Sequence, residues 1–295
     1  MKKPKPTFES SLKSIEIENF FDRTFYRPLG YRIALWLTPT GITPNMVTIV
    51  SIFFGVGAGF LFYPQNIWIN LLGFFILMIA NTLDCADGQL ARLTGIKSAV
   101  GRILDGVAGD LWFISIYICI AFRLSAEIGT SLAWVLASLA GASTLIQANI
   151  SDYYKTAHLY FTSLSKGAEF DTVEKTKAKY AQTPNGINKV LCWLYVYYTI
   201  LQTKTAPQLQ NLIGKLIGKY GEDFPEEVRL RLRKKSLEVM PYINITTFNW
   251  RSVGLLFSIL IQQIWVYLLF EIIVLNVIIF IAIRKHAKFC REFEV

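Results

Sequence analysis

The sequence predicts an all-α, polytopic membrane protein with six transmembrane helices, an N-terminal interfacial helix and a long helical cytoplasmic insertion. Three observations support this fold class. The 295-residue chain is 53% hydrophobic but only 17% charged, whereas a soluble domain carries about 25% charged residues. Its apolar residues occur in long blocks rather than in amphipathic stripes. The net charge of +9 fits a membrane protein whose basic residues lie beside anionic lipid headgroups.

Several other classes of protein and site are disfavoured. No nucleic-acid-binding module is visible, so we expect no nucleic-acid partner despite the basic charge. The four cysteines share no metal-binding or disulfide spacing. The two histidines, His158 and His286, are too far apart in sequence to predict a histidine-based metal site. Residues 1–14 are basic but lack an apolar core, so we do not expect a signal peptide.

The N-terminal region, residues 1–39, is predicted to lie in the membrane interface. Between residues 15 and 37, apolar and aromatic side chains are interleaved with Arg23, Arg27 and Arg32. This mixture is typical of helices that lie along a membrane surface. The alternative is an ordinary solvated helix that leads into the first span.

The next region, residues 40–155, is expected to form the first four transmembrane helices. Thr43 is suited to cap the first helix, and Pro44 is suited to its first position. The first apolar run is long enough to cross the bilayer once. The four apolar runs cover residues 46–62, 67–80, 100–122 and 128–150, with a turn at residues 63–66.

Residues 156–247 form the predicted insertion, because Lys, Arg, Glu and Tyr are frequent there. Its apolar patch, residues 190–201, is too short to predict a span, so we expect it to be interfacial or packed on the membrane domain.

The last two transmembrane helices and a basic tail are expected in residues 248–295. The apolar run at residues 253–283 is too long for one helix across a hydrocarbon core of roughly 30 Å. The pair Gln262-Gln263 therefore predicts a tight hairpin between two spans. Lys and Arg gather in the regions on one side of this topology, and Arg123 is the exception. Both termini and the active site are then expected in the cytoplasm, in a bacterial inner membrane or an equivalent membrane.

Four aspartates stand where a charge is costly, at the ends of membrane helices or inside apolar segments. Such carboxylates must be paired or must bind a metal. Asp84 and Asp87 are three residues apart and share a helix face. Together with Asp105 from the next helix, they predict a hard oxygen site for Mg²⁺, Mn²⁺ or Ca²⁺. The fourth acid is Asp110.

Gly88 and Arg92 follow these acids on the same helix. Gly88 lacks a side chain, so a ligand or a neighbouring helix can approach its backbone. Arg92 lies one turn farther on, where it is placed for a phosphate oxygen. Intramembrane acids also occur in cation transporters, and a helix-end acid can simply reach into the headgroups, so the cluster alone does not establish an enzyme.

The spacing of these residues is more specific than their chemistry. The pattern Asp84-x-x-Asp87-Gly88-x-x-Ala91-Arg92, followed after eight residues by Gly101-x-x-x-Asp105, resembles the signature of the CDP-alcohol phosphotransferase (CDP-alcohol phosphatidyltransferase) family. The segment Thr43-Pro44-Asn45-Met46-Val47-Thr48 is also similar to that family. The resemblance covers the six spans and leaves the insertion unexplained.

The resemblance implies an enzyme that transfers a substituted phosphate from a CDP-linked donor to an alcohol and releases CMP. Either the donor or the acceptor is then a lipid, and such proteins are often homodimers. The implied cofactor is Mg²⁺ or Mn²⁺, as one ion or two, bound by Asp84, Asp87 and Asp105. The residues implied to line the cytidine and diphosphate site are Gly88, Ala91 and Arg92, together with Asn45 and Thr48.

One position departs from the family pattern, which ends Asp-x-x-x-Asp. Position 109 is Gly, and the acid follows at Asp110. On a regular helix, Asp110 points about 140° away from the direction of Asp105. A wide, π-like turn between Gly106 and Gly109 would turn it back toward the site. We expect Asp110 to serve as a metal ligand and as the catalytic base beside Asp105. The alternatives are a base elsewhere and an inactive relative.

The acceptor alcohol is less clearly specified. Family members that take a phosphorylated polyol present arginines near the end of the fourth helix, whereas Lys155 is the single cation among residues 147–155. The neutral and acidic groups there favour inositol or inositol phosphate as the headgroup, with ethanolamine, serine or glycerol phosphate as alternatives. The same segment also fits a simple helix end at the membrane surface. The candidate acceptor residues are Lys97, Arg102, Asp152 and Lys155.

Two functions of other classes compete with a phospholipid-synthesising transferase. A divalent-cation transporter is expected to need polar residues along several spans, whereas these acids crowd into the second and third. An inactive membrane scaffold is supported only by the displaced acid at Asp110.

Overall fold

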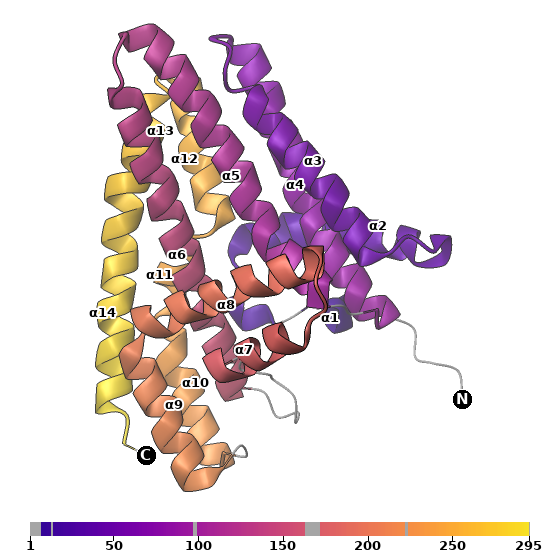
Figure 1. Ribbon diagram of the computed structural model, residues 1–295, viewed down its shortest axis with the longest axis vertical. Coiled ribbons are helices and arrows are strands. Elements are labelled where there is room, and N and C mark those ends of the chain that lie inside the picture. The colour runs from indigo at the N-terminus through magenta and orange to yellow at the C-terminus, as the bar shows by residue number, and fades with distance from the viewer. Residues whose placement is uncertain (1–6, 13, 97–98, 163–171, 222–223, 295) are drawn as a thin grey trace. The chain divides into compact units, whose positions relative to one another are not determined.

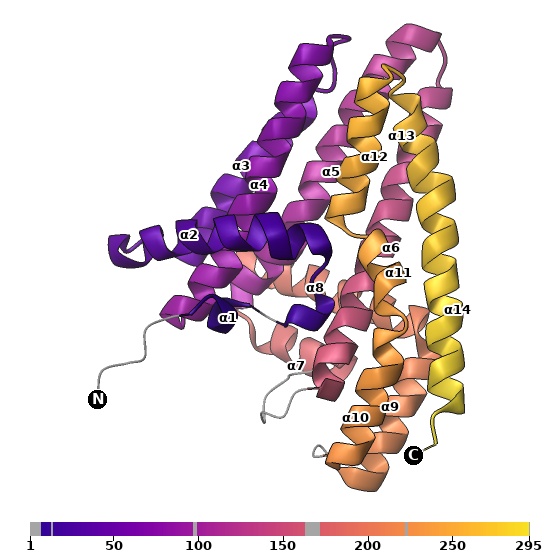
Figure 2. The same cartoon turned by 180° about the vertical axis from the view of Figure 1, so that it is seen from behind.

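The computed structural model describes residues 7–12, 14–96, 99–162, 172–221 and 224–294. Within these ranges the backbone forms helices and connecting loops and no strand (Figures 1 and 2). This confirms the predicted all-α class.

The N-terminal region is less regular than the sequence predicts. It contains α1 (Phe8–Ser11), a 3₁₀ turn η1 (Ile15–Ile17), a π-helical turn η2 (Asp22–Tyr26), α2 (Arg27–Leu37) and a 3₁₀ turn η3 (Thr38–Thr40). The predicted helix over residues 15–37 is interrupted because Asn19 caps a new helix. Its side-chain oxygen accepts a hydrogen bond from the backbone N–H of Asp22 (2.9 Å).

Four long helices follow: α3 (Pro44–Phe60), α4 (Ile67–Thr94), α5 (Ala99–Ile128) and α6 (Leu132–Thr162). The predicted cap of α3 is confirmed, because the Thr43 side chain accepts a hydrogen bond from the Met46 N–H and Pro44 is the first helical residue. Asn66 caps α4 by accepting from the N–H groups of Trp68 and Ile69. The turn between α3 and α4 lies at the predicted place.

The remaining elements are α7 (Val173–Gln182), α8 (Ile187–Thr205), α9 (Pro207–Tyr220), α10 (Glu226–Leu237), α11 (Met240–Ile245), α12 (Phe248–Leu260), α13 (Trp265–Leu269), the π-helical η4 (Phe270–Leu275) and α14 (Asn276–Glu292). The long C-terminal apolar run breaks between α12 and α13. Gln262 has a left-handed backbone there, with φ of 57°. This confirms the break predicted at the two glutamines.

Four helical stretches of the described chain are long and apolar enough to cross a membrane: Ile67–Thr94, Leu104–Ile128, Leu132–Thr162 and Trp265–Glu292. The chain is therefore an integral membrane protein with several spans. Two further apolar helices, α3 with 17 residues and α12 with 13, are shorter. Six spans remain a prediction.

The chain divides into two compact units. The first comprises Met1–Thr144 and Phe248–Ile272, and the second comprises Leu145–Thr247 and Ile273–Val295. Each unit has its own buried apolar cluster, around Trp112 and Ile116 in the first and around Tyr154 and Leu212 in the second. The predicted regions 1–39, 40–155, 156–247 and 248–295 describe membrane topology and remain predictions.

Glycines set the distances between the helices of the first unit. A Cβ added at Gly55 of α3 would lie 2.1 Å from Cδ1 of Trp112, and one at Gly59 would lie 2.1 Å from Oγ of Ser115. Small residues four positions apart are a common means of close helix packing in membranes. In the same way, Gly30 lets α2 approach the backbone of α4. These contacts bring α3 close to α5 and α2 close to the polar end of α4.

Candidate metal centre

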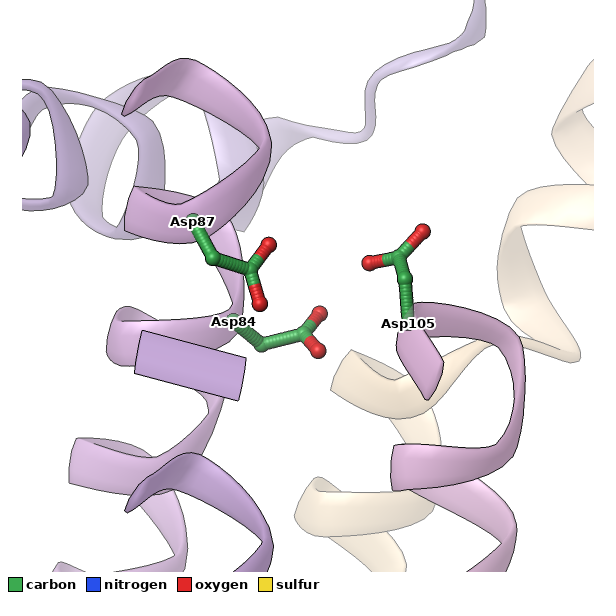
Figure 3. A group of neighbouring side chains, drawn as sticks. All are labelled: Asp84, Asp87 and Asp105. Atoms are coloured by element: carbon green, nitrogen blue, oxygen red, sulfur yellow. The ribbon is translucent and has the colours of Figure 1, made fainter. Parts of the chain in front are cut away.

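Helices α4 and α5 bring three carboxylates together. Asp84 and Asp87 project from successive turns of α4, and Asp105 faces them from the first turns of α5 (Figure 3). One ligand oxygen from each carboxylate lies within 4.8 Å of the others. These are the three acids that the sequence pattern places at a metal site.

Thr48 on α3 fixes the innermost of these acids. Its hydroxyl donates a hydrogen bond of 2.5 Å to Oδ2 of Asp87, and it also lies 3.1 Å from the carbonyl oxygen of Pro44. Both Thr48 and Asp87 are buried. Thr48 therefore orients a carboxylate of the metal centre, and its role as a nucleotide contact, which the family resemblance implies, stays a prediction.

The three carboxylates fit a divalent cation. Oδ1 of Asp84 is buried and has no hydrogen-bond partner within the described ranges. A buried carboxylate oxygen left in this state is costly. A hard cation such as Mg²⁺ or Mn²⁺ prefers carboxylate oxygens, so a bound ion would satisfy this atom and reduce the repulsion among the three acids.

Arg27, the first residue of α2, supplies a positive charge beside this centre. It pairs with Glu18 at 2.9 Å and lies within electrostatic range of Asp84. Burial alone would lower the pKa of the guanidinium, but neighbouring groups, Glu18 among them, raise it above its ordinary value. The sequence suggested only an interfacial role for Arg27, because no local pattern links residues so far apart in the chain.

Arg92 is held by the N-terminal segment. Its Nε donates a hydrogen bond to the carbonyl oxygen of Ser11, and the neighbouring Gln89 donates to the hydroxyl of Ser11 (3.0 Å). The guanidinium lies over Gly88, where a Cβ would stand 3.4 Å from Nη2. Nη2 itself is buried and has no partner in the part of the chain that is described. Arg92 thus keeps a donor for an additional acceptor.

The other two residues of the expected nucleotide site lie on these same helices. Asn45 is half-buried and lies one turn before Thr48 on α3, and Ala91 is half-buried on α4 one residue before Arg92.

Asp110 is not part of this group of acids. Residues 99–128 form an uninterrupted α-helix, so the wide turn that we considered between Gly106 and Gly109 does not form. Asp110 is instead within electrostatic range of Arg251 on α12. The regular helix therefore leaves Asp110 about 140° from the direction of Asp105.

The candidate acceptor residues are distributed over the chain. Lys97 and the side chain of Arg102 lie outside the described residues. Asp152 belongs to the second unit, where it accepts hydrogen bonds from Tyr198 and Gln202, both at 3.2 Å. Lys155 is half-buried on the same helix. Whether these residues contact an acceptor remains a prediction.

Comparisons with known proteins identify the family that the pattern of aspartates resembles. The model of one family, described as CDP-alcohol phosphatidyltransferase, matches residues 41–200. The chain is 40% identical to the archaetidylinositol phosphate synthase of Pyrococcus horikoshii over 90 aligned residues. The aligned region covers 30% of this chain and 46% of that protein. It is 30% identical over 84 residues to an uncharacterized protein of Aquifex aeolicus, covering 28% of this chain and 41% of that protein. The chain thus matches less than half the length of each of these two relatives.

Proposed function

Because the chain belongs to the CDP-alcohol phosphatidyltransferase family, whose model matches more than half of it, we propose that it is a phospholipid-synthesising transferase. It moves a substituted phosphate from a CDP-linked donor to an alcohol and releases CMP, and one of the two substrates is a lipid. The observation that carries this proposal is the convergence of three carboxylates from α4 and α5 in an integral membrane protein.

In this proposal, Asp84, Asp87 and Asp105 hold Mg²⁺ or Mn²⁺, as one ion or two. The bound cation would neutralise the diphosphate and stabilise the CMP that leaves. Thr48 keeps the carboxylate of Asp87 turned toward the centre. The free donor of Arg92 binds a diphosphate oxygen. The remaining lining residues of the donor site are Gly88, Ala91 and Asn45.

A carboxylate must also take the proton of the attacking hydroxyl. Asp105 is the most exposed of the three acids, so it is the one that an incoming alcohol reaches most easily. Asp110 is the second candidate, and it would need a change in α5 to approach the same alcohol. We therefore place the base at Asp105 and treat Asp110 as the alternative.

We propose inositol phosphate or inositol as the headgroup. The neutral and acidic side chains near Asp152 favour a polyol, and the Pyrococcus horikoshii relative is named an archaetidylinositol phosphate synthase. Lys97, Arg102 and Lys155 are the cations proposed to bind a phosphate on the acceptor. Ethanolamine, serine and glycerol phosphate are the alternative headgroups.

The proposal extends to the assembly and its place in the cell. Lys and Arg are frequent in the regions that the six-span topology places on one side, which supports a cytoplasmic location for the site and for both termini. We also propose a homodimer in a bacterial inner membrane or an equivalent membrane.

Release of CMP by the purified protein tests this function. The assay combines Mn²⁺, a CDP-linked diacyl or ether lipid, and each alcohol in turn, followed by CDP-linked polar heads with a lipid alcohol. We expect CMP and a new phospholipid with one matched pair of substrates. The Asp87→Asn variant is the negative control. Absence of CMP with every pair, from protein that binds Mn²⁺, would exclude the transferase.

A further inference from the structure

The second unit carries an apolar stripe on the outside of a helix. Five large apolar side chains of α8 are between 41% and 57% exposed. On an α-helix they fall within an arc of about 100°, because they are spaced three or four residues apart. The members of this stripe, which we call the α8 stripe, are Val190, Trp193, Leu194, Tyr197 and Leu201.

The opposite face of α8 is tied to α6 by polar contacts. Tyr198 donates a hydrogen bond to Asp152 (3.2 Å), and its carbonyl oxygen accepts one from Asn149 (3.3 Å). Gln202 donates to Asp152 at 3.2 Å, and Thr199 is buried between them. The inward side of α8 therefore carries polar groups beside the buried Cys192 and Val196, whereas its outward side is apolar, unlike the outward side of a helix on the surface of a soluble protein.

The position of α8 matches that of the membrane surface. Asn149 and Asp152 are both close to 20 residues from the start of Leu132–Thr162, a stretch able to cross a membrane, and about 20 residues of helix cross the hydrocarbon core. Figure 1 shows α8 running across α6 rather than along it. A helix that lies in the interfacial plane crosses a spanning helix in this way.

The ends of the stripe carry the groups that an anionic lipid surface attracts. Lys189 and Lys204 flank the stripe on α8, and residues 172–205 contain five lysines and one glutamate. Trp193 packs edge-on against Tyr197 with ring centroids 4.6 Å apart. Tryptophan and tyrosine concentrate at membrane interfaces, because their rings are apolar while their N–H and O–H groups remain polar.

A cavity at the turn between α7 and α8 has room for a headgroup. Its volume is about 450 Å³ and its lining includes Tyr180, Gly186 and Trp193. Lys189 also lines it, with Nζ 2.9 Å from the side-chain oxygen of Asn185 and 5.5 Å from the centroid of the Tyr180 ring. The cavity thus presents a cation beside aromatic rings.

We propose that α7 and α8 form a membrane-docking hairpin that lies on the bilayer surface. The α8 stripe enters the interface, and the cavity beside Lys189 holds the phosphate of an anionic phospholipid headgroup. This inference does not depend on the proposed transferase activity, because it uses none of the residues of the metal centre.

A fluorescent label on the stripe tests the proposal in the full-length protein. The four native cysteines are buried, so the unsubstituted chain measures background labelling. Tyr197→Cys and, as a matched control, Glu227→Cys on the exposed side of α10 are labelled with an environment-sensitive maleimide. Both proteins are placed in nanodiscs of phosphatidylcholine with or without phosphatidylglycerol, and circular dichroism checks their fold.

We expect the label at position 197 to emit at shorter wavelength, to be shielded from aqueous iodide and to be quenched by nitroxide-labelled lipid. The label at position 227 should show none of these effects. Equal iodide quenching at the two positions would overturn the proposal. Shielding at position 197 without quenching by nitroxide-labelled lipid would also overturn it, because protein would then cover the stripe.

The role of Lys189 is tested by charge reversal. We expect Lys189→Glu to reduce the additional lipid quenching that phosphatidylglycerol produces at position 197, whereas Lys215→Glu on α9 should leave it unchanged. An equal effect of both variants would show that only the total charge matters and would exclude a headgroup site at the cavity.

Discussion

The hydroxyl of Thr48 on α3 donates a 2.5 Å hydrogen bond to Oδ2 of Asp87 on α4, and both side chains are buried. Thr48→Val keeps the volume of the side chain but removes this donor. Since groups that orient metal ligands usually contribute about 10- to 100-fold to metal affinity or activity, we expect a loss of that size in CMP release. Raised Mn²⁺ concentrations should restore part of the activity.

Thr82→Val on α4 is the control for this substitution. Its hydroxyl donates to the carbonyl oxygen of Met78 within the same helix, so activity should stay near that of the parent protein. Equal losses in the two variants would show that Thr48 acts through packing alone.

Removal of the divalent cation should abolish activity reversibly. Because the buried Oδ1 of Asp84 lacks a partner among the described residues, a cation at the three acids should also stabilise the fold, by an amount that grows with the logarithm of its concentration relative to Kd. We expect Mn²⁺ to raise the apparent Tm of the parent protein but not that of Asp84→Asn. Glu127→Gln, an exposed acid near the other end of α5, should respond like the parent.

The identity of the base can be decided with two aspartate variants. We expect Asp105→Asn to lower kcat by about 100- to 10,000-fold, the usual contribution of a general base. Asp110→Asn should lower kcat by less than about tenfold, because the regular α5 helix turns this residue away from the metal centre. A large loss in Asp110→Asn with unchanged Mn²⁺ binding would instead identify Asp110 as the base.

The contact between α3 and α5 predicts a large difference between two neighbouring glycines. Gly55→Ala places a methyl group 2.1 Å from Cδ1 of Trp112, so we expect a loss of about 1–3 kcal/mol in unfolding free energy. A Cβ at Gly57 meets no atom within 4 Å, and Gly57→Ala should be neutral or slightly stabilising. Thermal unfolding in detergent measures both, and similar Tm values would contradict the packing described here.

A buried ion pair in the first unit gives a prediction about stability. Arg251 on α12 pairs with Glu271 on η4 at 2.7 Å, and both side chains are almost fully buried. Arg251→Met should cost about 3–5 kcal/mol because it leaves an acid without its partner. The double variant with Glu271→Met should recover most of this loss.

An exposed pair serves as the comparison. Lys235 and Glu238 lie 3.2 Å apart on the surface, and Lys235→Met should cost at most about 1 kcal/mol. An equally small cost for Arg251→Met would show that the buried pair is not needed for folding.

Local patterns were sufficient to predict many of the helices and three of the acids. The cap at Thr43 and the break at Gln262 depend on residues that are adjacent in the chain, so the sequence displays them directly. Asp84 and Asp87 share a face by helical spacing alone.

Contacts between distant segments could not be predicted in this way. The hydrogen bond from Thr48 to Asp87 joins residues 39 positions apart, on two different helices, so no local pattern links them. The prediction of one helix over residues 15–37 was wrong, because a new helix begins after the cap at Asn19. Asn19 is one polar residue among several in that segment, so the sequence does not single it out as a cap.

The contact between Ser11 and Arg92 is made by a backbone carbonyl oxygen. Any residue at position 11 offers the same acceptor, so a substitution there preserves this bond, and comparing residue types would not reveal it. Its presence depends instead on the length of chain between Ser11 and Arg27, where α2 begins. Insertions or deletions in this stretch, rather than point mutations, are therefore the changes that would release the arginine.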